Sequence, residues 1–216
     1  QKNCNYPCKD LRGCGIGFKL IEALTQERGL SFEMILPYID LVAMAIAADI
    51  VPILGENRIL TYYGLAQIRK NPREGIKLFV TGIKRELNVT DLVFVIAPRL
   101  NAAGRIKHGS LAVELLLSND PTEALSRGRA IELFNSERQV LDQHITEQAL
   151  DQIVENQEQN NYSSVVFQPD WHKGVIGIVA SRLIEKYYRP TIVFTASGDF
   201  FTGSVRSVKG LDVLQM

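Results

Sequence analysis

"NDPTEALSRGRAIELFNSERQVLDQHITEQALDQIVEN", residues 119–156, decides the fold because it has the pattern of one long helix. Asp120 suits the N-cap, Pro121 the first helical position, and Glu123 the return bond of a capping box. Apolar residues then recur at helical spacing, at positions 130, 134, 141, 145, 149 and 153. At 1.5 Å per residue the helix is roughly 50 Å long, longer than a small domain is wide. We therefore expect it to connect two bodies.

The residues before this helix predict a helical region. Apolar residues recur there at steps of three and four, with prolines between the segments. The expected helices are Leu11–Leu24, Glu33–Ile50, Arg58–Arg69, Gly75–Glu86, residues 96–106 and Leu111–Leu117. This part of the chain therefore resembles a stack of short helices joined by tight loops.

The residues after the long helix predict a small α/β unit. The expected order is a strand at Ser164–Phe167, a helix at Val175–Tyr187, a strand at Thr191–Thr195, a turn at 197–199 and a strand at Phe200–Ser207. The last residues, "GLDVLQM", suggest the first turns of a further helix. The chain is therefore assigned to the α/β class with a mixed sheet. Its expected domains are a helical region 1–119, a linker helix 120–157 and a truncated α/β domain 158–216.

Composition narrows the function only a little. The 24 Lys and Arg residues balance 24 Asp and Glu residues, so an affinity for polyanions would have to come from local clusters. The three cysteines lie at spacing C-x3-C-x5-C, which matches no usual zinc pair and predicts reduced thiols. The longest apolar stretch, Leu41 to Gly55, is shorter than the roughly 20 residues of a membrane helix. We expect a soluble, cytoplasmic protein without a membrane partner.

"DWHKGVIGIVASR", residues 170–182, places polar side chains at the start of an apolar helix. A helix that follows a strand presents unpaired N–H groups and a positive dipole end to a ligand. His172 lies in this loop, and Gly174 and Gly177 have no side chain that would block an approaching anion. The stretch predicts a seat for a phosphate. The alternative is a capped helix in which His172 packs on Trp171.

The strand at "FFTGSVRS", residues 200–207, is the second phosphate-binding candidate. Because side chains alternate along a strand, Thr202, Ser204 and Arg206 share one face. Two hydroxyls and a guanidinium are suitable donors to phosphate oxygens. The alternative is an edge strand whose polar face is only solvated. Together with His172, however, these residues favour one phosphate pocket.

Two further segments carry candidate residues. In "IAPRLNAAGRI", residues 96–106, Asn101 and Arg105 are neighbours on a helix, and Arg99 precedes them. Arginines beside small residues suit a backbone phosphate, although a solvated helix fits equally well. Asp49 is the only charged residue between Asp40 and Glu56. Since a buried unpaired carboxylate is costly, Asp49 should be exposed, cap a helix, pair with an arginine or bind a metal.

Four of these segments together resemble a known family. "AADIVPILGENR", "APRLNAAGRI", "WHKGVIGIVASRL" and "GSVRS" with a following glycine occur in the order and spacing of the RecJ family. These are single-strand-specific DNA exonucleases of the DHH phosphoesterase superfamily. "YPCKDLRGCGIGFKL" also resembles the family segment that follows the Asp-His-His motif.

The resemblance implies a layout and a reaction. It implies a DHH domain with a manganese or magnesium centre, a linking helix and a smaller C-terminal domain, with single-stranded DNA between them. It places Asp49 on the last metal-binding aspartate, and it makes Asp49 and His172 catalytic. The phosphate-binding positions it implies are Arg99, Asn101, Arg105, Gly174, Gly203, Ser204 and Arg206. The implied reaction is metal-assisted hydrolysis of phosphodiesters from a 5′ end, releasing mononucleotides in DNA repair and recombination. A monomer that works with a single-strand-binding protein and a helicase is also implied.

The chain departs from the family pattern in two ways. Where the family has Gly-Thr-x-Ala-Asp before the metal aspartate, this chain has "AIAAD". The upstream Asp-rich and Asp-His-His motifs are missing, as is an oligonucleotide-binding domain. We therefore expect a fragment that does not retain the metals and is inactive alone. The alternatives are a DHH phosphodiesterase acting on short RNA or cyclic dinucleotides, or a non-catalytic nucleic-acid-binding scaffold.

Overall fold

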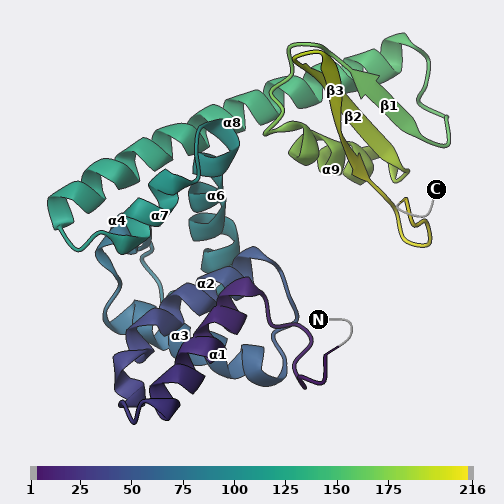
Figure 1. Ribbon diagram of the computed structural model, residues 1–216. Helices are drawn as coiled ribbons and strands as arrows, with labels where there is room; N and C mark the ends of the chain where they lie inside the picture. The colour runs from purple at the N-terminus through teal and green to yellow at the C-terminus, as the bar shows by residue number, and fades with distance from the viewer. Residues whose placement is uncertain (1–3, 214–216) are drawn as a thin grey trace. The chain divides into compact units, whose positions relative to one another are not determined.

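The computed structural model describes residues 4–213. The chain divides into two compact units (Figure 1). Unit 1 contains the residues up to Ala103 together with Gly109–Glu132, and unit 2 contains Gly104–His108 together with the residues from Leu133 onward. The long helix α8, Pro121–Glu155, has the predicted extent and contributes to both units. The predicted three-part division at residues 119 and 157 remains a prediction.

Unit 1 is helical, as the sequence predicts. Its helices are α1 (Gly13–Glu27), α2 (Ile39–Ala48), α3 (Gly55–Lys70), α4 (Glu74–Thr81), α5 (Val89–Asp91), α6 (Ala97–Ile106, whose last turn belongs to unit 2) and α7 (Ser110–Leu117). A π-helical turn, Leu92–Ile96, lies between α5 and α6. The single helix predicted for Glu33–Ile50 is wrong, because two 3₁₀ turns precede α2. Pro37 lies at the start of the second turn, where the missing N–H of proline is tolerated.

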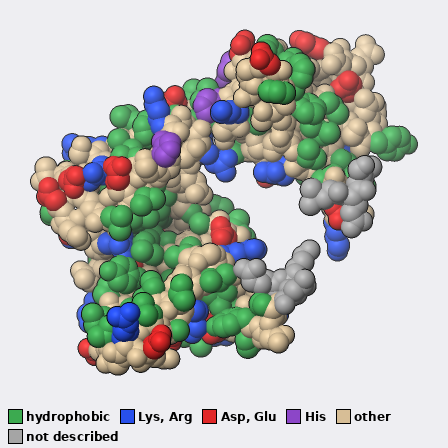
Figure 2. All heavy atoms as spheres, in the orientation of Figure 1, with side chains coloured by type: hydrophobic (Ala, Val, Ile, Leu, Met, Phe, Trp, Pro, Cys, Tyr) green, Lys and Arg blue, Asp and Glu red, His purple; other side chains and the backbone are tan. Residues whose placement is uncertain are grey.

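The core of unit 1 forms where α1, α2 and α3 meet. Phe18, Val42, Ile46 and Leu60 are buried together there. Gly64 allows α3 to approach α2 closely, since a Cβ at this position would lie 2.6 Å from the Ile39 carbonyl oxygen. Unit 1 also leaves many large apolar side chains exposed (Figure 2).

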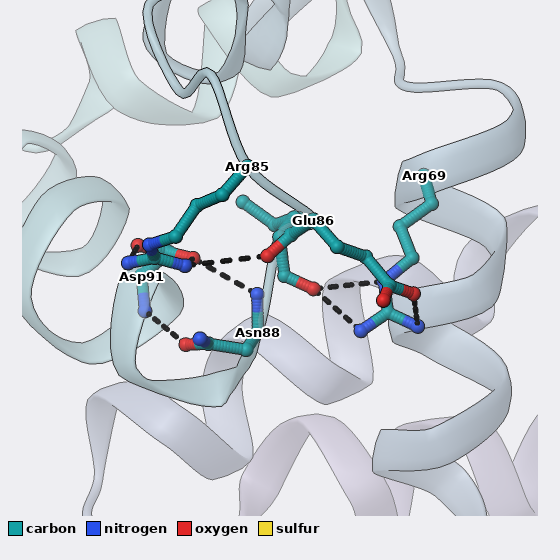
Figure 3. A network of polar contacts seen from close by, with 6 residues as sticks. Arg69, Arg85, Glu86, Asn88 and Asp91 are labelled. Carbon is teal, nitrogen blue, oxygen red and sulfur yellow. Dashed lines mark hydrogen bonds and ion pairs between the residues drawn. The ribbon is translucent and has the colours of Figure 1, made fainter.

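A polar network fixes the segment that leads into α6 (Figure 3). Asn88 and Asp91 form a reciprocal capping box at α5. The Arg85 guanidinium donates to both carboxylate oxygens of the buried Asp91, at 2.8 and 2.7 Å. These hydrogen bonds from Arg85 are the main reason that the pKa of Asp91 lies below its ordinary value. The carbonyl of Leu87 accepts hydrogen bonds from Arg69, so both ends of this loop are held.

Unit 2 is a small α/β fold. Its strands are β1 (Ser164–Phe167), β2 (Thr191–Ser197) and β3 (Phe200–Arg206), and α9 spans Ile176–Tyr187. The sheet order is β1-β2-β3, with β1 parallel and β3 antiparallel to β2. The predicted mixed sheet is therefore confirmed, with bounds shifted by one or two residues. The predicted helix at 210–216 is wrong for residues 210–213, which are not helical, and the remainder lies outside the described residues.

Both α8 and α9 cover the same face of this sheet. Ile145, Ala149 and Ile153 of α8 share one buried cluster with Val179 of α9 and Val193 of β2. The opposite face is more open, and Phe167 and Phe201 meet there edge to face with ring centroids 5.3 Å apart. The sheet therefore has one face that packs against helices. Two of the predicted phosphate-binding residues of β3 lie on this face, near the start of α9.

The structure of α8 agrees with the sequence prediction at its N-cap and differs from it in two other details. Asp120 caps the helix as predicted, by accepting a hydrogen bond from the Thr122 N–H at 3.1 Å. Glu123, however, does not complete a capping box, because its carboxylate contacts Ser118 and Arg127 instead. The buried line of α8 also continues through Asn135 and Asp142, which the apolar pattern does not contain.

Among residues 4–213, no helix combines the length and the apolar character that crossing a membrane requires.

Candidate functional site

The polar face of β3 lies against the first turns of α9. Ser204 is paired with Val193 and Arg206 with Thr191, and both β2 partners are fully buried on the helix-covered face. A Cβ at Gly177 would lie 3.1 Å from the Ser204 hydroxyl oxygen and 3.3 Å from Nη2 of Arg206. The predicted alignment of Ser204 and Arg206 is therefore present, and Gly177 leaves the space that the guanidinium occupies.

Neutral groups hold the guanidinium of Arg206. Its Nε donates to the hydroxyl of Ser181 at 3.2 Å, and its Nη1 donates to the carbonyl of Val205 at 3.0 Å. Ser181 in turn donates to the carbonyl of Gly177, one turn earlier in α9. Within residues 4–213 no carboxylate contacts Arg206. The side chain is thus oriented while its positive charge remains available to a ligand.

His172 is fixed at the turn before α9. Its Nδ1 accepts a hydrogen bond from the N–H of Gly174 at 3.1 Å, so a neutral imidazole carries its proton on Nε2. The preceding Trp171 anchors the turn, because its ring is buried and its Nε1 donates to Gln148 at 2.8 Å. The carbonyl of Trp171 also accepts the hydroxyl of Thr195 at 2.6 Å. His172, which is half-buried, can therefore present an N–H donor to an anion.

Gly174 lies against the end of α6. A Cβ there would come within 2.1 Å of the carbonyl oxygen of Arg105, so only glycine fits. Nη1 of Arg105 donates to the carbonyl of Gly174 at 3.1 Å. The structure thus brings Arg105, Gly174 and His172 together. Close packing against the backbone of residue 105 is by itself sufficient to explain a glycine at position 174.

The other predicted phosphate-binding residues lie in different surroundings. Arg99 is engaged inside unit 1, where it donates to Glu132 at 2.6 Å and to the carbonyl of Val95 at 2.7 Å. Asn101 is exposed on α6 in the same unit. Gly203 points to the far face of β3, where a Cβ would lie 2.6 Å from the ring of Phe194. Any role of these three residues in binding phosphate stays a prediction.

Asp49 is the C-cap residue of α2 and is exposed. The next residue, Ile50, has φ of 50°, and the N–H of Val51 bonds back to the carbonyl of Ile46. This is the pattern of a Schellman end, in which a β-branched residue replaces the usual glycine. No group of three or more possible metal ligands occurs among residues 4–213. The described residues therefore do not by themselves fit a divalent metal, and Asp49 as a metal ligand stays a prediction.

Sequence reasoning missed Ser181, which orients Arg206. Its spacing of four residues from Gly177 places both on one side of α9, and this signal is visible in the sequence once the helix is known. Arg138, Asp142 and Arg182 were missed as well. The partner of Arg182 lies 40 residues away in the sequence, on α8.

Comparison with known proteins shows which proteins the chain resembles. It shares 38% identity over a 220-residue alignment with the single-stranded-DNA-specific exonuclease RecJ of Bacillus subtilis, covering 100% of this chain and 27% of that protein. With RecJ of Escherichia coli it shares 36% identity, covering 97% of this chain and 39% of the relative. The crystal structure of RecJ with Mn²⁺ from Thermus thermophilus matches with a TM-score of 0.87 and 32% identity, over 98% of this chain and 31% of the other.

In sequence and in fold, the chain matches one part of the RecJ proteins over nearly its whole length. The structure of the same Thermus protein with Mg²⁺ matches with a TM-score of 0.86. No family model matches the chain. The chain spans 27% to 40% of the length of the curated relatives it matches. The similarity to RecJ therefore confirms the predicted family and the α/β class, while the activity of a whole RecJ protein belongs to the proposal that follows.

Proposed function

We propose that this chain contributes the phosphate-holding surface of a single-stranded-DNA-specific exonuclease of the RecJ type. The observation that carries the proposal is Arg206, which neutral hydroxyl and carbonyl groups hold in place, with no carboxylate partner among residues 4–213. The names of the RecJ relatives support single-stranded DNA as the ligand that carries the phosphate. The phosphate seat, formed by His172, Ser204, Arg206 and the start of α9, then binds a phosphate of the strand close to the bond that is cut.

Each group of the seat has a distinct role in this proposal. Arg206 supplies the charge and a planar pair of N–H donors that match phosphate oxygens. Ser204 adds a hydroxyl on the same face of β3, and His172 adds its Nε2–H from the loop. The first N–H groups of α9 favour an anion at the same end of the helix. Because these donors are held before binding, little order is lost when the phosphate arrives.

The residues of the phosphate seat do not form a binding site for a divalent metal. The solved RecJ structures contain Mg²⁺ or Mn²⁺, and such an ion would supply a nucleophilic hydroxide. Asp49 alone cannot hold it, so no reaction step is assigned to a metal on the described residues. We propose that this chain by itself binds the strand without cutting it.

The finer parts of the proposal follow the family. We propose digestion from the 5′ end to mononucleotides in DNA repair and recombination, with Asp49 and His172 as the catalytic residues. The proposed setting is the cytoplasm, with the protein acting as a monomer beside a single-strand-binding protein and a helicase. The proposed phosphate seat does not depend on any of these features. It depends on Arg206 and the groups that surround it.

The test measures binding of short thymidine oligonucleotides to the chain. We expect 5′-phosphorylated single strands to bind more tightly than 3′-phosphorylated ones, because the seat takes a terminal 5′-phosphate. Arg206→Ala should weaken binding about tenfold or more, since hydrogen bonds to charged groups contribute about 1.5–3 kcal/mol. The matched control is Arg129→Ala, which removes an exposed arginine of α8 in unit 1.

Equal losses in the Arg206 and Arg129 variants would contradict the seat, because they would show only a general charge effect. Manganese-dependent release of nucleotides by the unaltered chain would contradict the proposed lack of cutting. Tight binding of cyclic dinucleotides in preference to single strands would move the assignment to another DHH phosphodiesterase.

A further inference from the structure

A polar group interrupts the buried face of α8 inside unit 2. Asp142 is 1% exposed, and Asn135, about two turns earlier, is also buried. Between them the side chain of Arg138 is only 13% exposed. A charged group seldom lies on the buried side of a helix unless it is paired or serves a ligand. The group therefore needs a reason beyond packing.

The charges in this group do not balance. Arg182 of α9 occupies both carboxylate oxygens of Asp142, with Nε at 2.8 Å and Nη2 at 2.7 Å. Arg138 is left with a long contact of 3.9 Å between its Nη1 and the same carboxylate. Its Nη2 donates to the side-chain oxygen of Asn135, and its buried Nε has no hydrogen-bond partner within the described part of the chain.

Arg105 adds a third positive charge. Burial lowers the pKa of the Arg138 guanidinium, and the nearby charges of Arg105 and Arg182 lower it further. Two of the three guanidiniums are accessible, since Arg105 is exposed and the Arg182 side chain is 50% exposed. Among residues 4–213, Asp142 is the one carboxylate in ion-pair contact with this group, and the negative charge of Glu185 also acts on Arg182. Three guanidiniums against these two carboxylates leave an excess of positive charge.

This cluster adjoins the phosphate seat along α9. Arg105 donates to the carbonyl of Gly174, in the turn just before α9, and Arg182 lies within α9. Gly177 and Ser181, which border Arg206, lie between these two positions in the sequence, and Ser181 directly precedes Arg182. The turn before α9 and α9 itself therefore contribute residues to both groups.

We propose that Arg105, Arg138 and Arg182 form a second phosphate subsite, which binds the next phosphate of a single strand whose terminal phosphate lies at Arg206. The inference rests on the proposed function and adds a subsite to it. Arg105 and Arg182 contact the phosphate, while Arg138 supplies charge from beneath them. Asp142 orients Arg182 and limits the repulsion among the three guanidiniums when no strand is bound.

The experiment compares two probes that differ by one nucleotide, which includes one phosphate. They are thymidine 5′-monophosphate and the 5′-phosphorylated dinucleotide pTpT, titrated calorimetrically into the 216-residue chain. We expect the dinucleotide to bind the unaltered chain more tightly. In Arg138→Gln, whose amide can still reach Asn135, the ratio of the two affinities should fall about tenfold, which corresponds to about 1.4 kcal/mol. The salt slope for pTpT should also fall by about 0.7, the value for one phosphate contact on a single strand.

Two further variants keep the outcomes distinct. Arg129→Gln, the exposed control on α8, should leave the ratio unchanged. Arg206→Ala should weaken both probes and preserve much of the ratio. If Arg138→Gln does not fold, the exposed Arg105→Gln provides the same test.

An unchanged ratio and salt slope in Arg138→Gln and Arg105→Gln, together with weaker binding of both probes by Arg206→Ala, would overturn the second subsite and leave the proposed function intact. Failure of the unaltered chain to bind either probe would instead count against the phosphate seat, and with it the subsite that depends on it.

Discussion

The arginines of the two units are compensated differently. In unit 1, Arg69, Arg73, Arg85, Arg99 and Arg127 each contact a carboxylate. In unit 2, the partners of Arg105, Arg189 and Arg206 are hydroxyl and carbonyl oxygens, apart from the Tyr187 ring near Arg189. Within the described part of unit 2, Asp142 is the one carboxylate that contacts an arginine. The carboxylate-paired arginines of unit 1 thus serve the fold, whereas Arg105 and Arg206 of unit 2 keep their charge for a ligand.

The partner of an arginine side chain decides how strongly that side chain can attract an anion. A guanidinium whose carboxylate partner is close has already lost much of its attraction for a phosphate, because the pair is nearly neutral. Arg99 illustrates this case, since Glu132 lies 2.6 Å from its Nε. Carbonyl and hydroxyl partners orient the donor group without cancelling its charge, and this is the case of Arg206.

Removing one arginine from each unit gives the largest expected contrast. Arg73→Ala leaves Asp40, which is 2% exposed, without the guanidinium that contacts both its oxygens at 2.6 Å. An uncompensated buried charge of this kind costs about 3–5 kcal/mol of stability. Arg206→Ala, by contrast, should change stability by no more than about 0.5 kcal/mol, because the side chain is exposed. Urea denaturation measures both values. Similar losses in the two variants would break the comparison between the units.

Substitutions at two glycines of unit 2 should change stability by an intermediate amount, and they test which contacts belong to the fold and which to the phosphate seat. In Gly174→Ala the new methyl group would meet the backbone of Arg105 at 2.1 Å, so the chain must shift at a cost of about 1–3 kcal/mol. In Gly177→Ala the nearest atoms belong to Ser204 and Arg206, whose side chains can move. This second change should leave stability the same or raise it by up to about 1 kcal/mol, since alanine favours a helix. Phosphate affinity should nevertheless fall. Thermal unfolding together with phosphate titration checks both, and equal destabilisation would contradict the assigned contacts.

Much of the fold could be predicted from sequence because it depends on local patterns. The bounds of α8 and β1 follow from capping, proline and alternation, and they agree with the structure. The helix predicted for Glu33–Ile50 failed because periodicity continues across Pro37, although the backbone there forms 3₁₀ turns. The capping box of Asn88 and Asp91 was missed, since the sequence prediction began this helix only at residue 96, whereas the helical run begins at Val89 and continues through a π-helical turn into α6.

The site could be predicted only in part. The shared face of Ser204 and Arg206 follows from strand alternation, and the place of His172 follows from its position before a helix. Arg99 shows the limit, because sequence could not reveal that Glu132 of α8 lies beside it. The cluster around Asp142 was equally hidden, since its closest partner, Arg182, lies on another helix. Charge compensation depends on tertiary neighbours, and a local pattern does not contain them.

The smallest expected effect concerns a compensated pair of unit 1. The pKa of Asp91 is lowered mainly by hydrogen bonds from Arg85, so the ionised carboxylate stabilises the folded chain. This contribution is complete above the ordinary carboxyl value of about 3.9, and it is lost as the pH falls through the lower folded value. Asp91→Asn should therefore cost about 1 kcal/mol near neutral pH and progressively less in acid.

Denaturation curves of Asp91→Asn and the unaltered chain, measured from about pH 7 down to about pH 3, give this difference directly. The Arg206→Ala variant is the matched comparison from unit 2, because no carboxylate pairs with that side chain among residues 4–213. Its small stability difference should not vary over the acid range. A stability difference in Asp91→Asn that stays constant with pH would mean that the Arg85 contact does not favour the charged form, and the two units would then differ less than their ion pairs indicate.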